Sequence, residues 1–222
     1  MPTPECWGAD PPYICTGYVA SRPGSAVLKQ FLSTGVEGDT REALALVKRA
    51  GATLARFHRA LPLPPAAQQK PRRGPKLHGI ARRLVGSPRG TGTSLVHLHT
   101  DFGPYNLILT ETGDMLIVDL PGSDRVGRPE EDLGRLIDSV SRRVPASNTA
   151  LRAALVDAAL AGYESESEVA VRTGDRRALV ESFAARHALL MVLAGVRHLS
   201  TWRLRSGSCS IKAARRRVRE NR

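Results

Sequence analysis

The sequence predicts an α+β fold that is mostly helical and carries a small β-hairpin. Apolar residues recur at helical spacing over residues 44–61 and again over 175–200. Two short apolar segments, 106–110 and 115–119, flank the sequence Glu-Thr-Gly-Asp, which is typical of a hairpin turn. The 222-residue chain is 41% hydrophobic and 24% charged, so it can bury a sizeable core, and wholesale disorder is excluded.

The first third of the chain is expected to hold one short strand and two helices. Residues 1–12 are rich in proline and are expected to be irregular. Residues 13–20 are β-branched and aromatic, which predicts a strand closed by an Arg-Pro-Gly turn. A short helix is expected over 25–33. Asp39 precedes a glutamate by three residues and is the predicted N-cap of a long helix that ends before Pro62.

The remaining elements surround the hairpin. Residues 61–92 are rich in Pro, Gly and Arg, which predicts an exposed connection with a short helix near residues 79–85. A short apolar strand is expected at 94–98, just before the hairpin. Three helices are then expected after it, over residues 132–140, 148–163 and 175–200.

The charge pattern favours a bound cation over a nucleic-acid partner. The net charge is +12, but 28 of the 33 basic residues are arginine, a bias that a GC-rich coding sequence also produces. The basic tail after Trp202 is expected to be a solvated helix, with nucleic-acid or anionic-surface binding as the alternative. Carboxylates gather instead in residues 101–138, where nine acidic residues face three basic ones. A metal ion is the simplest explanation.

Several protein classes are excluded by composition. The chain has no run of about 18 uncharged apolar residues, so no membrane span or membrane partner is expected. Its start lacks a basic region followed by an apolar stretch, so no secretory signal is expected. The three cysteines, Cys6, Cys15 and Cys209, offer no disulfide framework or CxxC metal pair. We therefore expect a cytoplasmic protein.

The chemistry of the chain is concentrated in residues 95–120, with the sequence LVHLHTDFGPYNLILTETGDMLIVDL. The predicted hairpin folds the chain back, so Asp119 can return beside Asn106. A carboxylate and an amide oxygen are ligands that suit Mg²⁺, which keeps waters and shares substrate phosphates. Asp101 could then accept or orient a hydroxyl proton. Together these groups are what phosphoryl transfer requires of a protein.

The segment from His99 to Asn106, H-T-D-F-G-P-Y-N, resembles the catalytic loop of the aminoglycoside phosphotransferase and choline kinase-like family. The family pattern is H-x-D-x-x-x-x-N, followed by a hairpin and a metal-binding Asp, here Asp119. Residues 54–58 (LARFH) and 128–133 (RPEEDL) are similar to two further family motifs. Four motifs in the right order make the resemblance specific, and it extends from Tyr13 to the C-terminus.

The resemblance implies a fold, a set of roles and two cofactors. The fold is the mostly helical C-terminal lobe of a protein-kinase-like phosphotransferase. Asp101 would be the catalytic base, and Asn106 and Asp119 would hold magnesium. His99 and Asp132 would support the loop. The implied cofactors are ATP and Mg²⁺, and the implied partners are a nucleotide and a small-molecule hydroxyl substrate.

Two departures from the family pattern affect what the chain is expected to do. Thr100 stands where the family usually has Gly. Most of the N-terminal lobe, with its phosphate-covering loop and Lys, is not recognised in the sequence. We therefore expect that the chain is a fragment, that its start is misassigned, or that it no longer binds ATP in the usual way. The expected division is a residual hinge strand and N-terminal segment (1–24), a kinase-like C-lobe (25–202) and a basic tail (203–222). Activity of this chain alone is expected to be weak or absent.

The sequence therefore predicts an ATP-dependent phosphotransferase that phosphorylates a hydroxyl of a small molecule. Because the region after Arg172 has few carboxylates, a neutral or anionic acceptor is favoured over a polycationic antibiotic. One alternative is a catalytically inactive remnant that serves as a binding module. Another is a basic nucleic-acid-binding protein. A third is a binuclear metal site that begins H-x-H-x-D at His97, although that motif would need another His at position 102, which is Phe.

Overall fold

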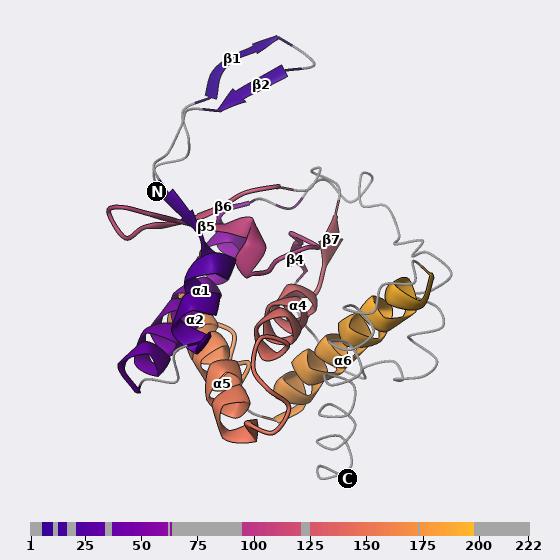
Figure 1. Cartoon of the computed structure of the whole chain (residues 1–222). Helices are drawn as coiled ribbons and strands as arrows, with labels where there is room; N and C mark the ends of the chain where they lie inside the picture. Colours follow the sequence, from indigo (N-terminus) through magenta and orange to yellow (C-terminus); the bar gives the residue numbers. More distant parts are fainter. Residues whose placement is uncertain are drawn as a thin grey trace.

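The structure is a computed structural model of the whole chain, shown in Figure 1. It describes most of the region from residue 21 to residue 197, together with two short strands before it. The described residues are 6–10, 13–16, 21–33, 37–61, 63, 95–120, 125–172 and 174–197. The predicted helix near 79–85 and the basic tail 203–222 lie outside them.

Helices dominate the described part of the chain and form two packed groups. They are α1 (Gly24–Ser33), α2 (Glu37–Ala60), α4 (Pro129–Ser141), α5 (Thr149–Ser165) and α6 (Gly174–Arg197). The long helix α2 packs along α5, and α4 packs against both α5 and α6 (Figure 1). Asn148 caps α5 by accepting a hydrogen bond from the Leu151 amide at 3.0 Å. The predicted helices at 25–33, 132–140 and 148–163 are confirmed, each with slightly different ends.

Two glycines allow α2 and α5 to approach closely. A Cβ atom at Gly51 of α2 would overlap the carbonyl oxygen of Ala159, and one at Gly162 of α5 would overlap that of Lys48. The two helices therefore lie nearly backbone to backbone over this stretch. This contact fixes the position of α2, whose last turn carries a residue of the candidate site.

The central sheet has three antiparallel strands, β3 (Ser21–Pro23), β5 (Leu107–Thr110) and β6 (Met115–Ile117), in the order β3-β5-β6. The hairpin β5–β6 pairs Leu107 with Ile117 and turns at Gly113, whose φ of 84° suits glycine. The predicted hairpin is thus confirmed, with strands that are one or two residues shorter than expected.

Two further strand pairs lie outside this sheet. The strand β4 (Val96–His97) pairs antiparallel with β7 (Val126–Gly127), so the predicted strand at 94–98 is present but shorter. Near the N-terminus, β1 (Cys6–Asp10) pairs antiparallel with β2 (Tyr13–Thr16). The expectation that residues 1–12 are irregular is therefore wrong for β1.

The start of α2 also corrects the sequence analysis. The helix begins at Glu37, so Asp39 lies inside its first turn and is not the N-cap. A carboxylate in the first turn still interacts favourably with the positive end of the helix, which explains the misleading capping pattern. At the other end, the helix closes at Ala60, just before Pro62, as predicted.

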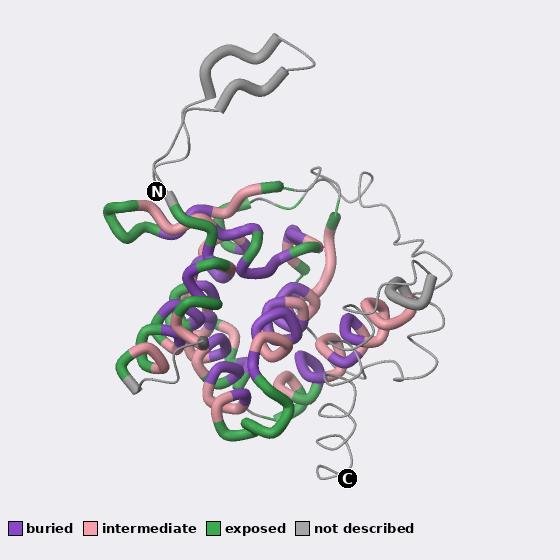
Figure 2. The backbone as a smooth tube through the Cα atoms, viewed as in Figure 1, coloured by how far each residue is buried: buried purple, intermediate pink, exposed green. Residues whose placement is uncertain are grey.

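The core lies between the helices and under the hairpin. Figure 2 shows buried positions along the inward sides of α2, α4 and α5. The largest fully buried side chains come from α1, α2, α4, α5 and the loop before β5, and include Leu28, Leu54, Phe102, Leu133, Leu136, Leu155 and Leu160. Phe102 belongs to the predicted catalytic loop, so this loop is anchored in the core. In α6, Leu179 of the predicted apolar stripe is buried, whereas Phe183 and Leu190 are only partly so.

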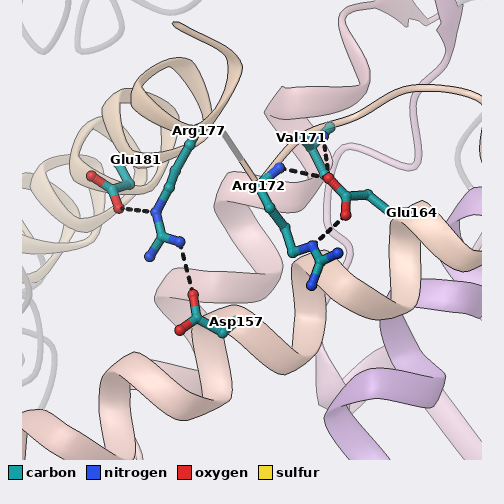
Figure 3. A network of polar contacts seen from close by, with 6 residues as sticks. All are labelled: Asp157, Glu164, Val171, Arg172, Arg177 and Glu181. Carbon is teal, nitrogen blue, oxygen red and sulfur yellow. Dashed lines mark hydrogen bonds and ion pairs between the residues drawn. The ribbon is translucent and has the colours of Figure 1, made fainter. Parts of the chain in front are cut away.

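Polar contacts link α5, α6 and the segment between them (Figure 3). Glu164 Oε1 accepts hydrogen bonds from the backbone amides of Val171 and Arg172, both at 2.7 Å, and its Oε2 pairs with the Arg172 guanidinium. Arg177 of α6 donates to Asp157 of α5 at 2.8 Å and lies 3.2 Å from Glu181. These contacts hold α6 against α5. None of the described helices is long and apolar enough to cross a membrane.

We predict that Glu164→Gln destabilises the fold at neutral pH. Burial raises the pKa of the Glu164 carboxyl, but hydrogen bonds from Arg172 and Val171 lower it by more, so the pKa lies below its usual value. A lowered folded-state pKa contributes stability above the unfolded-state pKa and loses it as the pH falls. Urea unfolding should show a loss of about 1–2 kcal/mol at pH 7 that shrinks below about pH 4.

Glu168→Gln is the matched control, because Glu168 is exposed on the segment that connects α5 to α6. It should change the free energy of unfolding by less than about 0.5 kcal/mol at either pH. Equal losses in the two variants at pH 7 would contradict the role assigned to Glu164.

Candidate active site

The loop from Leu98 to Asn106 joins β4 to the hairpin and is held by one buried carboxylate. Asp132, in the first turn of α4, has no solvent exposure. Its Oδ2 accepts the His99 amide at 2.7 Å, and its Oδ1 accepts the Thr100 amide at 2.9 Å. His58 Nε2, at the end of α2, lies 3.1 Å from the same Oδ2. Helices α2 and α4 therefore position the loop together.

His58 extends this support to α5. Its Nδ1 lies 3.0 Å from the Tyr163 hydroxyl, and the residue is 6% exposed. Because an aspartate oxygen is the acceptor at Nε2, His58 donates there. The sequence places His58 in the LARFH motif but gives no signal for its bond to Asp132.

Thr100 occupies a backbone conformation that disfavours it. Its φ is 63°, in the left-handed region where a β-branched residue is a conformational outlier. The Asp132 bond to its amide holds this conformation, and Arg125 donates to its hydroxyl at 3.4 Å. The resemblance places a glycine at this position in the family. The structure supplies the physical reason, because glycine adopts positive φ at little cost.

Asn106 faces Asp101 across the loop. Its Nδ2 donates to the Asp101 backbone carbonyl at 2.9 Å and lies 3.4 Å from Oδ2 of the Asp101 carboxylate. The Asn106 side chain is buried, and its residue ends a short 3₁₀ helix, η2 (Pro104–Asn106). Since the nitrogen of a primary amide points away from its oxygen, Oδ1 faces away from the Asp101 carbonyl. The Asp101 carboxylate is solvent-exposed.

The hairpin returns Asp119 to this loop. The Val118 amide donates to the Asn106 carbonyl at 3.0 Å, and His99 Nε2 lies 3.1 Å from the Val118 carbonyl. Both backbone groups of Val118 are thus tied to the loop, and Asp119 follows directly. Its φ of 57° is one that Asp tolerates, and its side chain is exposed. The predicted return of the chain to Asn106 is therefore present, whereas the metal-binding roles stay predictions.

The donor set fits a hard divalent cation. Asn106 and Asp119 supply an amide and a carboxylate oxygen from adjacent strand ends, and few protein oxygens with open water positions suit Mg²⁺. Within the described ranges, no group of three or more His, Cys, Asp and Glu side chains is placed to hold a metal. The alternative metal site beginning at His97 therefore gains no support from them.

Sequence reasoning missed one polar contact at the centre of the loop. The Tyr105 hydroxyl donates to Asp101 Oδ1 at 2.7 Å. Burial, the hydrogen bond to Asp101 and the charge of Asp101 together raise the pKa of Tyr105 above its usual value. No periodic pattern covers an irregular loop, so the sequence offered no signal for this pair.

The comparisons with solved structures define the fold class. A glucosamine kinase in complex with glucosamine, ADP and inorganic phosphate matches with a TM-score of 0.63 and 17% identity, over 87% of this chain and 58% of the kinase. A second crystal form of glucosamine kinase matches with a TM-score of 0.65 and 19% identity, over 99% and 66%. A choline/ethanolamine kinase family protein from Mesorhizobium loti matches with a TM-score of 0.56 and 18% identity, over 96% of this chain and 72% of that protein.

The chain therefore has a kinase-like phosphotransferase fold, and its described part is the mostly helical lobe that the sequence predicted. It spans about three fifths to two thirds of the length of the glucosamine kinases. No family model matches the chain, and no curated protein does either. At 17–19% identity, the similarity to these structures shows the fold of the chain and nothing finer.

We predict that Thr100→Gly stabilises the chain. The substitution relieves the strain of a β-branched residue in the left-handed conformation, which is about 1–3 kcal/mol. It also adds conformational freedom to the unfolded chain, which lowers stability by about 0.5–1 kcal/mol. Urea unfolding should show a net gain of about 0.5–1 kcal/mol. Thr100→Val is the control, because it also loses the hydroxyl but keeps the branching, and it should show no gain. A loss of stability in both variants would contradict the assignment of strain to Thr100.

Proposed function

We propose that the chain is the phosphotransferase part of an ATP-dependent kinase that phosphorylates a hydroxyl group of a small molecule. The observation that carries the proposal is the pair of Val118 backbone bonds, which return Asp119 to a loop carrying Asp101 and Asn106. The kinase-like fold supports it, since the matched glucosamine kinase is in complex with ADP and phosphate. Residues 25–202 would form the phosphotransferase domain, in the aminoglycoside phosphotransferase and choline kinase-like group.

Each site residue has a role that its position permits. Asp101 is exposed, so an acceptor hydroxyl can reach its carboxylate, which orients the hydroxyl and takes its proton. Asn106 and Asp119 would hold Mg²⁺ through oxygen atoms. A bound magnesium ion neutralises charge on the nucleotide phosphates. Asp132 acts only through the backbone of the loop.

The acceptor in this proposal is a small molecule with a hydroxyl group, and the charge that the chain prefers in its acceptor can be tested. The matched proteins are named for glucosamine and for choline and ethanolamine, which are cationic at neutral pH, so amino sugars and amino alcohols are one candidate class. Arg125 donates to Thr100 beside Asp101, and its positive charge favours a neutral or anionic acceptor instead. A panel of glucosamine, glucose and glucuronate separates these charge classes.

The experiment measures MgATP binding by calorimetry and phosphate transfer to the acceptor panel, with the whole chain. Asp101→Asn should leave MgATP binding within about twofold and lower turnover by about 10²–10⁴, the range of general base catalysis. Asp119→Asn should weaken magnesium-dependent ATP binding by about tenfold or more.

Asp114→Asn is the matched control for Asp119, because Asp114 is an exposed aspartate on the turn of the same hairpin. It should bind MgATP like the wild type. If Asp119→Asn behaves like Asp114→Asn, the magnesium assignment is wrong. If the wild-type chain binds no MgATP, the alternative of a catalytically inactive binding module is favoured over the kinase.

A further inference from the structure

Tyr105 contacts the proposed base directly from the same loop. Its hydroxyl donates to Oδ1 of Asp101 at 2.7 Å, a short distance typical of a hydrogen bond to a carboxylate. The residue as a whole is 40% exposed, so Tyr105 is not a core side chain. The other carboxylate oxygen, Oδ2, lies 3.4 Å from Asn106 Nδ2, which is too long for a strong bond. The two oxygens of Asp101 therefore differ in their hydrogen bonding: Oδ1 accepts a short bond, and Oδ2 accepts only a long one.

Gly103 makes room for this arrangement. A Cβ atom at position 103 would lie 2.7 Å from Cε1 and 3.0 Å from Cζ of the Tyr105 ring, and 3.2 Å from Ser139 Oγ. The φ of Gly103 is −165°, an extended conformation open to any residue. A Cβ atom here would therefore displace the Tyr105 ring, which lies against the backbone at this point.

Tyr105 is the donor in this contact. An ionised carboxylate can only accept a hydrogen bond, and a tyrosine hydroxyl ordinarily carries its proton at neutral pH. The hydroxyl therefore donates to Oδ1 of Asp101.

We propose that Tyr105 is a positioning residue that holds the Asp101 carboxylate through Oδ1, so that Oδ2 receives the acceptor hydroxyl. The proposal rests on the proposed function. In the transfer step, the acceptor oxygen bonds to the γ-phosphorus, the bond from that phosphorus to the β–γ bridging oxygen breaks, and ADP leaves with its electron pair. The acceptor proton passes to Oδ2. Tyr105 exchanges no atom in this step and acts only by fixing the base.

The first test separates binding from turnover. Tyr105→Phe should lower kcat by about tenfold while the KM for MgATP stays within about twofold, because a fixed orientation matters at the transition state. Gly103→Ala keeps the hydroxyl but displaces the ring, so it should lower kcat by a similar factor. In a Tyr105→Ala background, Gly103→Ala should cost nothing more, since the two changes act on one contact.

The second test reads the contact without turnover. The chain is labelled with 3-fluorotyrosine, and the fluorine NMR resonance of the label at position 105 is followed at neutral pH. Asp101→Asn should shift this resonance, because the substitution changes the acceptor of the Tyr105 hydroxyl. The resonance of Tyr163, whose hydroxyl contacts His58 instead, is the internal control and should not change.

The outcomes are separable. If kcat is unchanged in Tyr105→Phe, or if the fluorine resonance at position 105 does not respond to Asp101→Asn, the positioning role is wrong while the proposed function stands. If the wild-type chain phosphorylates no acceptor, the proposed function is wrong, and the positioning role is wrong with it.

Discussion

The candidate site depends on a single buried carboxylate. Asp132 has no solvent exposure, and both of its oxygens accept backbone hydrogen bonds from the loop, at His99 and Thr100. A buried carboxylate without partners would cost several kcal/mol, so these bonds are strongly favoured once α4 packs in the core. His58 adds a third donor from α2. The loop is therefore fixed to two helices by contacts at residues 99 and 100, directly before Asp101.

The other features of the site follow outward from this anchor. Held in place, His99 contacts the Val118 carbonyl, and Asn106 accepts the Val118 amide, so the hairpin carries Asp119 to the loop. The same anchor holds Thr100 in a left-handed conformation that a threonine would otherwise leave. Such strain at a site is stable only where the surrounding structure imposes it. Asp101 and Asp119 face solvent, and the buried residues Asp132 and His99 position them.

Local patterns in the sequence predicted most of the helices and the hairpin, because their apolar spacing and turn residues are short-range signals. Asp101, Asn106 and Asp119 were found by a motif, and the hairpin register explains why Asp119 returns. The strand β1 and the start of α2 at Glu37 were missed, since proline-rich and capping signals tolerate more than one outcome. The contacts of Asp132 with His58 and of Tyr105 with Asp101 depend on tertiary packing or loop conformation, which no pattern records.

The most direct test of this account is amide hydrogen exchange at His99 and Thr100. Asp132→Asn replaces one of the two acceptor oxygens with a donor, so at least one of these amides should exchange about 30-fold faster or more, corresponding to the loss of a hydrogen bond to a charged group. Asp138→Asn is the control, because Asp138 is equally buried in α4 but pairs with His187 and Arg142. It should leave both amides unchanged. Equal protection of His99 and Thr100 in the wild type and in Asp132→Asn would contradict the account.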